Sequence, residues 1–113
     1  MKARLKNERI PMLSTKESLI LELLLGSSTQ EMYGLELVNR SRGNLKRGTV
    51  YVTLSRMKDK GFIEDRLEEN TQTVGDQPRR RYRPTGYGAR VYEARQMAVK
   101  AHRLMPARLG GVL

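Results

Sequence analysis

The sequence predicts a mainly α-helical domain with one β-hairpin, an α+β fold. Three observations lead to this prediction. Apolar residues recur at steps of three and four in four separate segments, as on one face of a helix. Capping residues or glycines stand at the ends of these segments. Between the third and fourth segments, two extended runs flank a stretch of turn residues, which is typical of a hairpin.

We expect a basic N-terminal arm over residues 1–13 and a first helix that begins after Ser14. Ser14 and Glu17 fit a capping box, in which each side chain satisfies a backbone N–H of the other residue. Leucines and an isoleucine follow at helical spacing, and residues 26–28 end the helix.

The second helix is predicted over about residues 31–41, with Thr29 as its cap. Its inward stripe consists of Leu35, Leu37 and Val38, with Met32 as a further candidate. Gly34, near the start of this helix, is expected to permit close packing against a neighbouring element, at a cost in helix propensity.

The third helix is predicted over about residues 47–60. Its inward edge consists of Val50, Leu54 and Met57. Gly61 followed by Phe62 indicates a glycine C-cap, after which the apolar residue folds back onto the helix.

A hairpin is expected next, with strands over residues 63–69 and 79–83 and a long tip between them. The outgoing strand carries acids, namely Glu64, Asp65, Glu68 and Glu69. The returning strand carries arginines, so we expect ion pairs across the hairpin. We expect the returning strand and the tip to face the binding partner.

The last helix is predicted over residues 85–105 with Thr85 as its cap, followed by a flexible tail over residues 106–113. Its narrow stripe consists of Tyr87, Val91, Ala94, Ala98, Ala101 and Met105. This stripe either packs on its own domain or lies against the same helix of a second subunit. Because it is longer than a small three-helix domain can cover, we predict a two-fold homodimer.

The amino-acid composition limits the classes of function that this chain can have. A net charge of +10 in 113 residues favours a polyanion or an anionic membrane surface as partner. No helix combines a strong apolar face with a basic one, so a membrane role is not expected. Cysteine is absent and His102 is the single histidine. The usual catalytic triads and zinc sites therefore lack their residues, and we predict no enzyme activity, metal or cofactor.

Two helices joined by a short turn and followed by a hairpin form a winged helix-turn-helix over residues 14–84. This arrangement predicts a double-stranded DNA partner. The candidate contacts on the third helix are Lys46, Arg47, Thr49, Tyr51, Ser55 and Arg56. The candidate contacts in the wing are Gln77, Arg79 and Arg80. The alternatives are a solvated helix face and a hairpin edge that charge protects from aggregation.

Four segments also resemble motifs of the PadR-type transcriptional regulators, over roughly residues 13 to 95. They lie in the family's order and spacing, at residues 33–37, 46–51, 57–63 and 77–85. Two positions depart from the family pattern, because Lys46-Arg47 replaces Ser-Pro and Tyr33 replaces His. The resemblance implies a short-form dimeric repressor in the cytoplasm, at the nucleoid. It also implies a third helix in the major groove, a wing on the minor-groove side and dimerisation through the C-terminal helix.

A small-molecule effector occurs often in this family, but the sequence does not indicate one here. Two other functions stay open at this point. One is a general nucleic-acid binder, for RNA or for any DNA. The other is a winged-helix module that binds an acidic protein.

Overall fold

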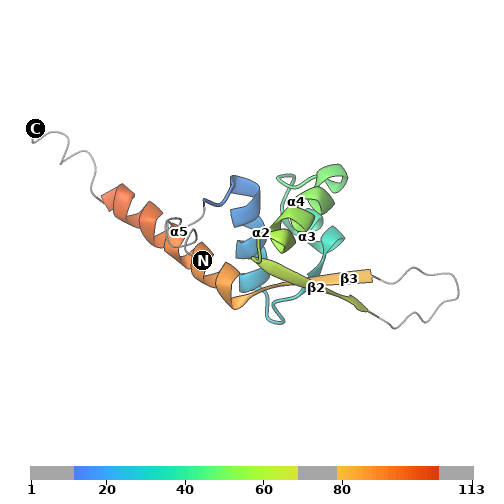
Figure 1. The fold of residues 1–113 in the computed structure, drawn as a ribbon. Coiled ribbons are helices and arrows are strands. Elements are labelled where there is room, and N and C mark those ends of the chain that lie inside the picture. Colours follow the sequence, from blue (N-terminus) through green and yellow to red (C-terminus); the bar gives the residue numbers. More distant parts are fainter. Residues whose placement is uncertain (1–11, 69–78, 105–113) are drawn as a thin grey trace, which may run out of the picture.

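The computed structural model describes residues 12–68 and 79–104 (Figure 1). Within these ranges the chain forms four helices and a three-stranded antiparallel sheet. The elements are α2 (Thr15–Gly26), β1 (Met32–Tyr33), α3 (Gly34–Arg40), α4 (Arg47–Asp59), β2 (Ile63–Glu68), β3 (Arg79–Pro84) and α5 (Gly86–Leu104). The predicted α+β fold is confirmed. Most of the predicted arm (residues 1–11), the hairpin tip and the tail lie outside the described residues.

The capping box at the start of α2 is present as predicted. The Glu17 backbone N–H donates to Ser14 Oγ at 3.1 Å, and the Ser14 N–H donates to Glu17 Oε1 at 2.9 Å. The second carboxylate oxygen of Glu17 accepts from Lys60 Nζ at 2.7 Å. Because Lys60 directly follows α4, this pair fixes the first turn of α2 to the end of α4.

The predicted start of the second helix is wrong. Met32–Tyr33 form the short strand β1, and the helix begins only at Gly34. Thr29 is not the cap, because its hydroxyl bonds the backbone of Glu31 instead. With this later start, Leu37 faces the core and is buried, whereas Leu35 lies on the opposite side and is 41% exposed.

The end of α4 follows the prediction. Gly61 has a φ of +82°, a conformation that glycine adopts without steric cost. The turn lets the Phe62 N–H donate back to the Met57 carbonyl at 2.9 Å. The Phe62 side chain is buried, and β2 begins at the next residue.

The sheet has the order β1-β3-β2, so the returning strand of the hairpin lies in its centre. β2 pairs with β3 from Ile63↔Pro84 to Glu68↔Arg79. β1 pairs with the other edge of β3 through Met32↔Tyr82 and Tyr33↔Arg81. β1 therefore joins the start of α3 to the middle of β3.

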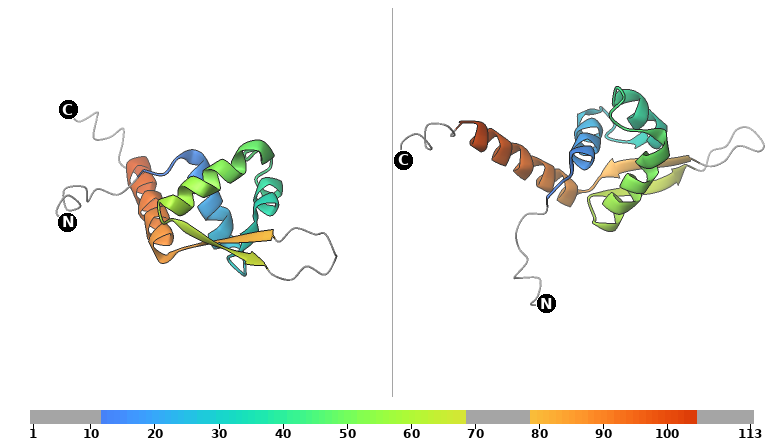
Figure 2. Two further views of the ribbon diagram at one scale, coloured as in Figure 1. Left: turned by 45° about the vertical axis from the view of Figure 1, so that its right-hand side comes forward. Right: turned by 90° about the horizontal axis from the view of Figure 1, so that it is seen from above.

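The core lies between α2, α3, α4 and the sheet, and α5 joins it through its first turns. Its apolar side chains are Leu13, Ile20, Leu21, Leu24, Met32, Leu37, Leu45, Val50, Leu54, Met57, Phe62, Ile63, Tyr82 and Val91. Figure 2 shows the hairpin and α5 projecting from opposite ends of this core.

Thr85 caps α5 as predicted, since its Oγ1 accepts from the Gly88 N–H at 2.9 Å. Gly88 then packs directly against the backbone of Phe62. A Cβ added at Gly88 would lie 2.8 Å from the Phe62 carbonyl carbon and closer still to its oxygen. The direction in which α5 leaves the domain therefore depends on this glycine.

We predict that Gly88→Ala lowers the free energy of unfolding by about 3 kcal/mol, because the methyl group overlaps backbone that cannot move aside cheaply. Urea denaturation measures this change. Gly86→Ala is the matched control in the same turn, because its Cβ meets only the flexible end of Arg90 at 3.4 Å. The control should shift stability by less than about 1 kcal/mol. Equal effects of the two substitutions would contradict the packing argument.

A second prediction concerns Glu17, whose side chain is 6% exposed. Burial raises its pKa, but the hydrogen bonds from Lys60 and Ser14 outweigh burial and hold the pKa below 4.5. A lowered pKa in the folded state means stabilisation that is present above pH 4.5 and lost as the pH falls through the folded-state pKa.

Glu17→Gln should therefore lower the free energy of unfolding by about 1 kcal/mol at pH 7. Its difference from the original chain should shrink as the pH falls below about 4.5. Denaturation curves at several pH values test this. Glu22→Gln, at an exposed position of the same helix, should have little effect at any pH. A constant difference for Glu17→Gln across this range would contradict the prediction.

Candidate nucleic-acid interface

The predicted contact residues of the third helix lie on the exposed side of α4. Val50, Leu54 and Met57 hold the opposite side in the core. All six predicted side chains are exposed, and they are Lys46, Arg47, Thr49, Tyr51, Ser55 and Arg56. Within residues 12–68 and 79–104, no ion pair involves Lys46, Arg47 or Arg56. Their positive charges are therefore available to an anionic partner.

Tyr51 is placed by contact with α3. Its ring lies over Gly34, where an added Cβ would come within 2.5 Å of Tyr51 Cε1. This confirms that Gly34 permits a close approach. Tyr51 remains 46% exposed, and its hydroxyl lies beside Gly34 at the start of α3.

A hollow of about 810 Å³ separates α3, the first half of α4 and β3. Its walls include three phenol rings, two guanidinium groups, the side-chain amide of Asn39 and the apolar side chain of Leu35. The rings are those of Tyr33, Tyr51 and Tyr82, and the guanidinium groups are those of Arg79 and Arg80. Two of the predicted wing contacts and one predicted helix contact thus border the same concave surface.

The arginines of β3 take part in the ion pairs predicted across the hairpin. Arg80 Nη1 lies 3.0 Å from Asp65 Oδ2, which also accepts from Lys58 Nζ at 3.2 Å. Arg83 Nε lies 2.7 Å from Glu64 Oε2. The predicted pairing is confirmed, and it lowers the net positive charge of the hairpin well below its arginine count.

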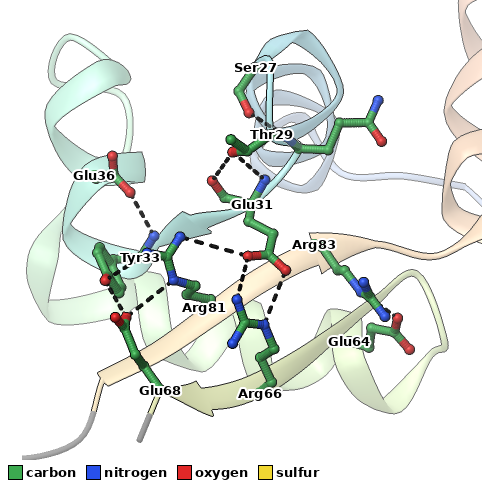
Figure 3. Close-up of polar contacts among 11 residues, drawn as sticks. Ser27, Thr29, Glu31, Tyr33, Glu36, Glu64, Arg66, Glu68, Arg81 and Arg83 are labelled. Atoms are coloured by element: carbon green, nitrogen blue, oxygen red, sulfur yellow. Dashed lines mark hydrogen bonds and ion pairs between the residues drawn. The ribbon is translucent and has the colours of Figure 1, made fainter. Parts of the chain in front are cut away.

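Arg81 belongs to a larger network on β3 and its two neighbouring strands, toward the end of β2 (Figure 3). Its Nε donates to Glu68 Oε1 at 3.1 Å, and its Nη2 donates to the Tyr33 hydroxyl at 3.0 Å. The Tyr33 hydroxyl in turn donates to Glu68. Glu31 accepts two hydrogen bonds from Arg66, at 2.9 and 3.2 Å. The network joins β1, β2 and β3.

Tyr33 is the centre of this cluster. Two guanidinium groups lie close to its ring, with Arg81 Cζ 4.7 Å and Arg79 Cζ 5.1 Å from the ring centroid. Its backbone N–H donates to Glu36 Oε1 at 3.0 Å, at the start of α3. Arg79, a predicted contact, is therefore held against β1 by stacking on a ring.

The two acids of the network are held in their charged forms. The hydrogen bond from Tyr33 and the charge of Arg81 lower the pKa of Glu68, against the opposing effect of desolvation. The hydrogen bond from Arg66 lowers the pKa of Glu31 in the same way. At neutral pH these carboxylates neutralise Arg66 and Arg81, which points to a structural role for both arginines.

The predicted dimer stripe of α5 divides into two faces. Val91 is 4% exposed in the core of its own domain, so its predicted place in a dimer interface is not available to it. On the same side, Arg95 Nη1 donates to Ser18 Oγ at 3.1 Å. Tyr87 contacts Phe62, with ring centroids 5.7 Å apart, and stays 41% exposed.

The other face of α5 is apolar and exposed. It consists of Met97, Ala98, Ala101 and Leu104, and the half-buried Ala94 lies at its edge. Met97 is 65% and Leu104 is 72% exposed. Sequence reasoning missed both, although they fall on the alanine stripe at steps of three and four.

On α4, sequence reasoning also missed Val52, which is 51% exposed. Its spacing from Val50, Leu54 and Met57 places it on the side of the helix opposite the core, which indicates exposure from the sequence alone. Two predicted residues, Gln77 and Met105, lie outside the described residues.

In the described part of the chain, histidine and acidic side chains form no group that could hold a metal ion. None of the helices described has both the length and the apolar character needed to cross a bilayer.

The sequence profile of the transcriptional regulator PadR-like family matches residues 20–94. The chain belongs to this family. The matched range runs from α2 through the hairpin into the first half of α5. None of the curated proteins matches the sequence.

Solved structures of PadR family regulators share the fold. One from Clostridium difficile is 25% identical, with a TM-score of 0.60, over 75% of this chain and 90% of that one. One from Eggerthella lenta is 27% identical, with a TM-score of 0.58, over 77% of this chain and 71% of that one. A protein from Halomicrobium mukohataei with a GntR superfamily winged-helix-turn-helix domain is 20% identical, with a TM-score of 0.65. That match covers 98% of this chain and 82% of the other, and it shows the fold alone.

The PadR-like assignment confirms the resemblance found in the sequence and makes the chain a transcriptional regulator by family. In the winged-helix fold, α4 occupies the place of the recognition helix, and β2 and β3 form the wing.

Proposed function

We propose that this PadR-like protein is a sequence-specific DNA-binding repressor that acts as a homodimer in the cytoplasm, at the nucleoid. α4 enters the major groove, and the wing lies on the flanking backbone or in the minor groove. Repression follows when the bound dimer blocks access of the transcription machinery to the same DNA.

One observation carries the proposal, namely the distribution of unpaired positive charge. Lys46, Arg47 and Arg56 on α4 form no ion pair within the described residues, whereas Arg66, Arg80, Arg81 and Arg83 of the hairpin all do. The hairpin acids thus bind the arginines that support the wing. Cations outside ion pairs also occur on other described elements, but the three at α4 lie on the helix whose first turns face base edges in this fold.

The contacts can be assigned to roles. Lys46 and Arg47, at the start of α4, suit a backbone phosphate, where the helix dipole adds to their charge. Arg56 lies two turns further along and suits a guanine, which accepts two hydrogen bonds from one guanidinium. Thr49, Tyr51 and Ser55 supply hydroxyl donors between them. Gln77 and Arg79 supply the wing contacts, whereas Arg80, a predicted contact, is paired with Asp65 and supports the wing.

Selection from a random pool of DNA duplexes at near-physiological salt tests this function. We expect a two-fold symmetric motif with half-sites about one helical turn apart. Arg56→Ala should weaken binding about tenfold and relax the preference at one base pair. Lys46→Ala should weaken binding to all sequences and reduce the salt slope by about one.

Lys100→Ala, at an exposed position of α5, is the control and should leave both affinity and slope unchanged. Uniform binding to any duplex or to RNA would indicate a general nucleic-acid binder instead. No binding at low salt would indicate a protein-interaction module.

The dimer is supported by the exposed apolar face of α5. Its small residues permit close approach of two helices, and Met97 and Leu104 supply the apolar area that burial would remove from water. A C2 interface would use the same face on both subunits.

We predict that Met97→Lys converts the dimer into a 13.0 kDa monomer in sedimentation equilibrium, with a dimer affinity at least about tenfold weaker. A charge placed in a buried apolar interface has no partner there. Gln96→Lys, on the polar side of the same turn, should leave the dimer intact. Equal sedimentation of the two variants would place the interface elsewhere.

A further inference from the structure

Two residues on the outward line of α4 lie outside the core. Gly48, Val52, Ser55 and Asp59 follow one another along the side of α4 that points away from the core. Glycine and β-branched valine are less favoured in helices than alanine. Val52 borders a hollow that Met12 and Leu13 also line, but it is not part of the core.

Gly48 illustrates this most clearly. Among the described residues, nothing lies within 4 Å of a Cβ built at Gly48, in contrast to the collisions at Gly34 and Gly88. Its φ is not among the positive values found in the chain. Alanine would therefore fit this position among the described residues, and the missing side chain leaves room for a partner.

Val52 is one turn further along the same line. It is 51% exposed and apolar, while its exposed neighbours Ser55 and Arg56 are polar. An exposed apolar side chain on a recognition face suits an apolar feature of the partner. In the major groove that feature is the C5 methyl group of thymine, since the other base-edge groups are hydrogen-bond donors or acceptors.

We propose that Gly48 and Val52 form the base-reading surface of α4, on which Val52 packs against the C5 methyl of a thymine. Gly48 removes the side chain that would hold the duplex away from the helix. Arg47 and Arg56, exposed on either side of this surface, provide the charge complementarity that brings the phosphate backbone alongside. This proposal rests on the proposed function and specifies the substrate feature that the helix recognises.

The test uses the duplex obtained by selection. Each thymine in turn is replaced by deoxyuridine, which removes only the methyl group. For the original chain, we expect one thymine per half-site at which this replacement weakens binding about fourfold, as burial of a methyl-sized group would produce. For Val52→Ala, deoxyuridine at that position should cause little further loss.

Two further variants complete the design. Gly48→Ala should bind DNA more weakly than Val52→Ala while keeping or raising the melting temperature, a combination that a structural role for Gly48 would not produce. Val99→Ala, which shortens a valine 37% exposed on α5, should retain the original pattern of deoxyuridine sensitivity.

The outcomes separate the two proposals. A selected motif with no methyl-sensitive thymine, or equal sensitivity in Val52→Ala, would overturn the base-reading role alone. Unchanged binding by Gly48→Ala would overturn the role of the glycine. A selection without any motif would overturn sequence-specific recognition and this inference together.

Discussion

The geometry of the molecule depends on the backbone of Phe62. Its N–H closes the end of α4 by donating to Met57, and its carbonyl accepts from the backbone N–H of Thr85 at 3.0 Å and from the Thr85 hydroxyl at 3.2 Å. Gly88 packs on the same carbonyl, and the ring is buried beneath Tyr87. The end of α4, both hairpin strands and the start of α5 thus meet at one residue. Their mutual orientation follows from hydrogen bonds that a buried backbone must satisfy.

The sequence predicted those parts of the fold that local chemistry determines. The capping box of Ser14 and Glu17, the turn at Gly61 and the cap at Thr85 each involve residues within three or five positions of one another. β1 could not be predicted in this way. Met32 and Tyr33 are extended because they pair with Tyr82 and Arg81, almost fifty residues away. Their apolar character also fits a helix, so the start of α3 was misplaced.

The candidate interface was predicted unevenly for the same reason. A helix face follows from spacing, so the six α4 residues were found on the exposed side. The strand register decides which arginines of the hairpin form ion pairs. It brings the Arg80 side chain to Asp65, and the Arg81 side chain to Glu68 and Tyr33. On α5, the stripe divides because α2 covers one side only. Val91 is consequently a core residue, and the exposed face includes Met97 and Leu104.

The network around Tyr33 has a consequence for the entropy of association. Immobilising a long side chain in an interface costs about 0.5–1.5 kcal/mol. Arg66 and Arg81 are already held by carboxylates, and Arg79 rests on the Tyr33 ring, before any partner arrives. Tyr33, which these arginines contact, also donates its backbone N–H to Glu36 at the start of α3. Gly34 in the same turn packs against the Tyr51 ring of α4. Folding has therefore met part of the ordering cost, and a partner that binds across α4 and the wing encounters one rigid surface.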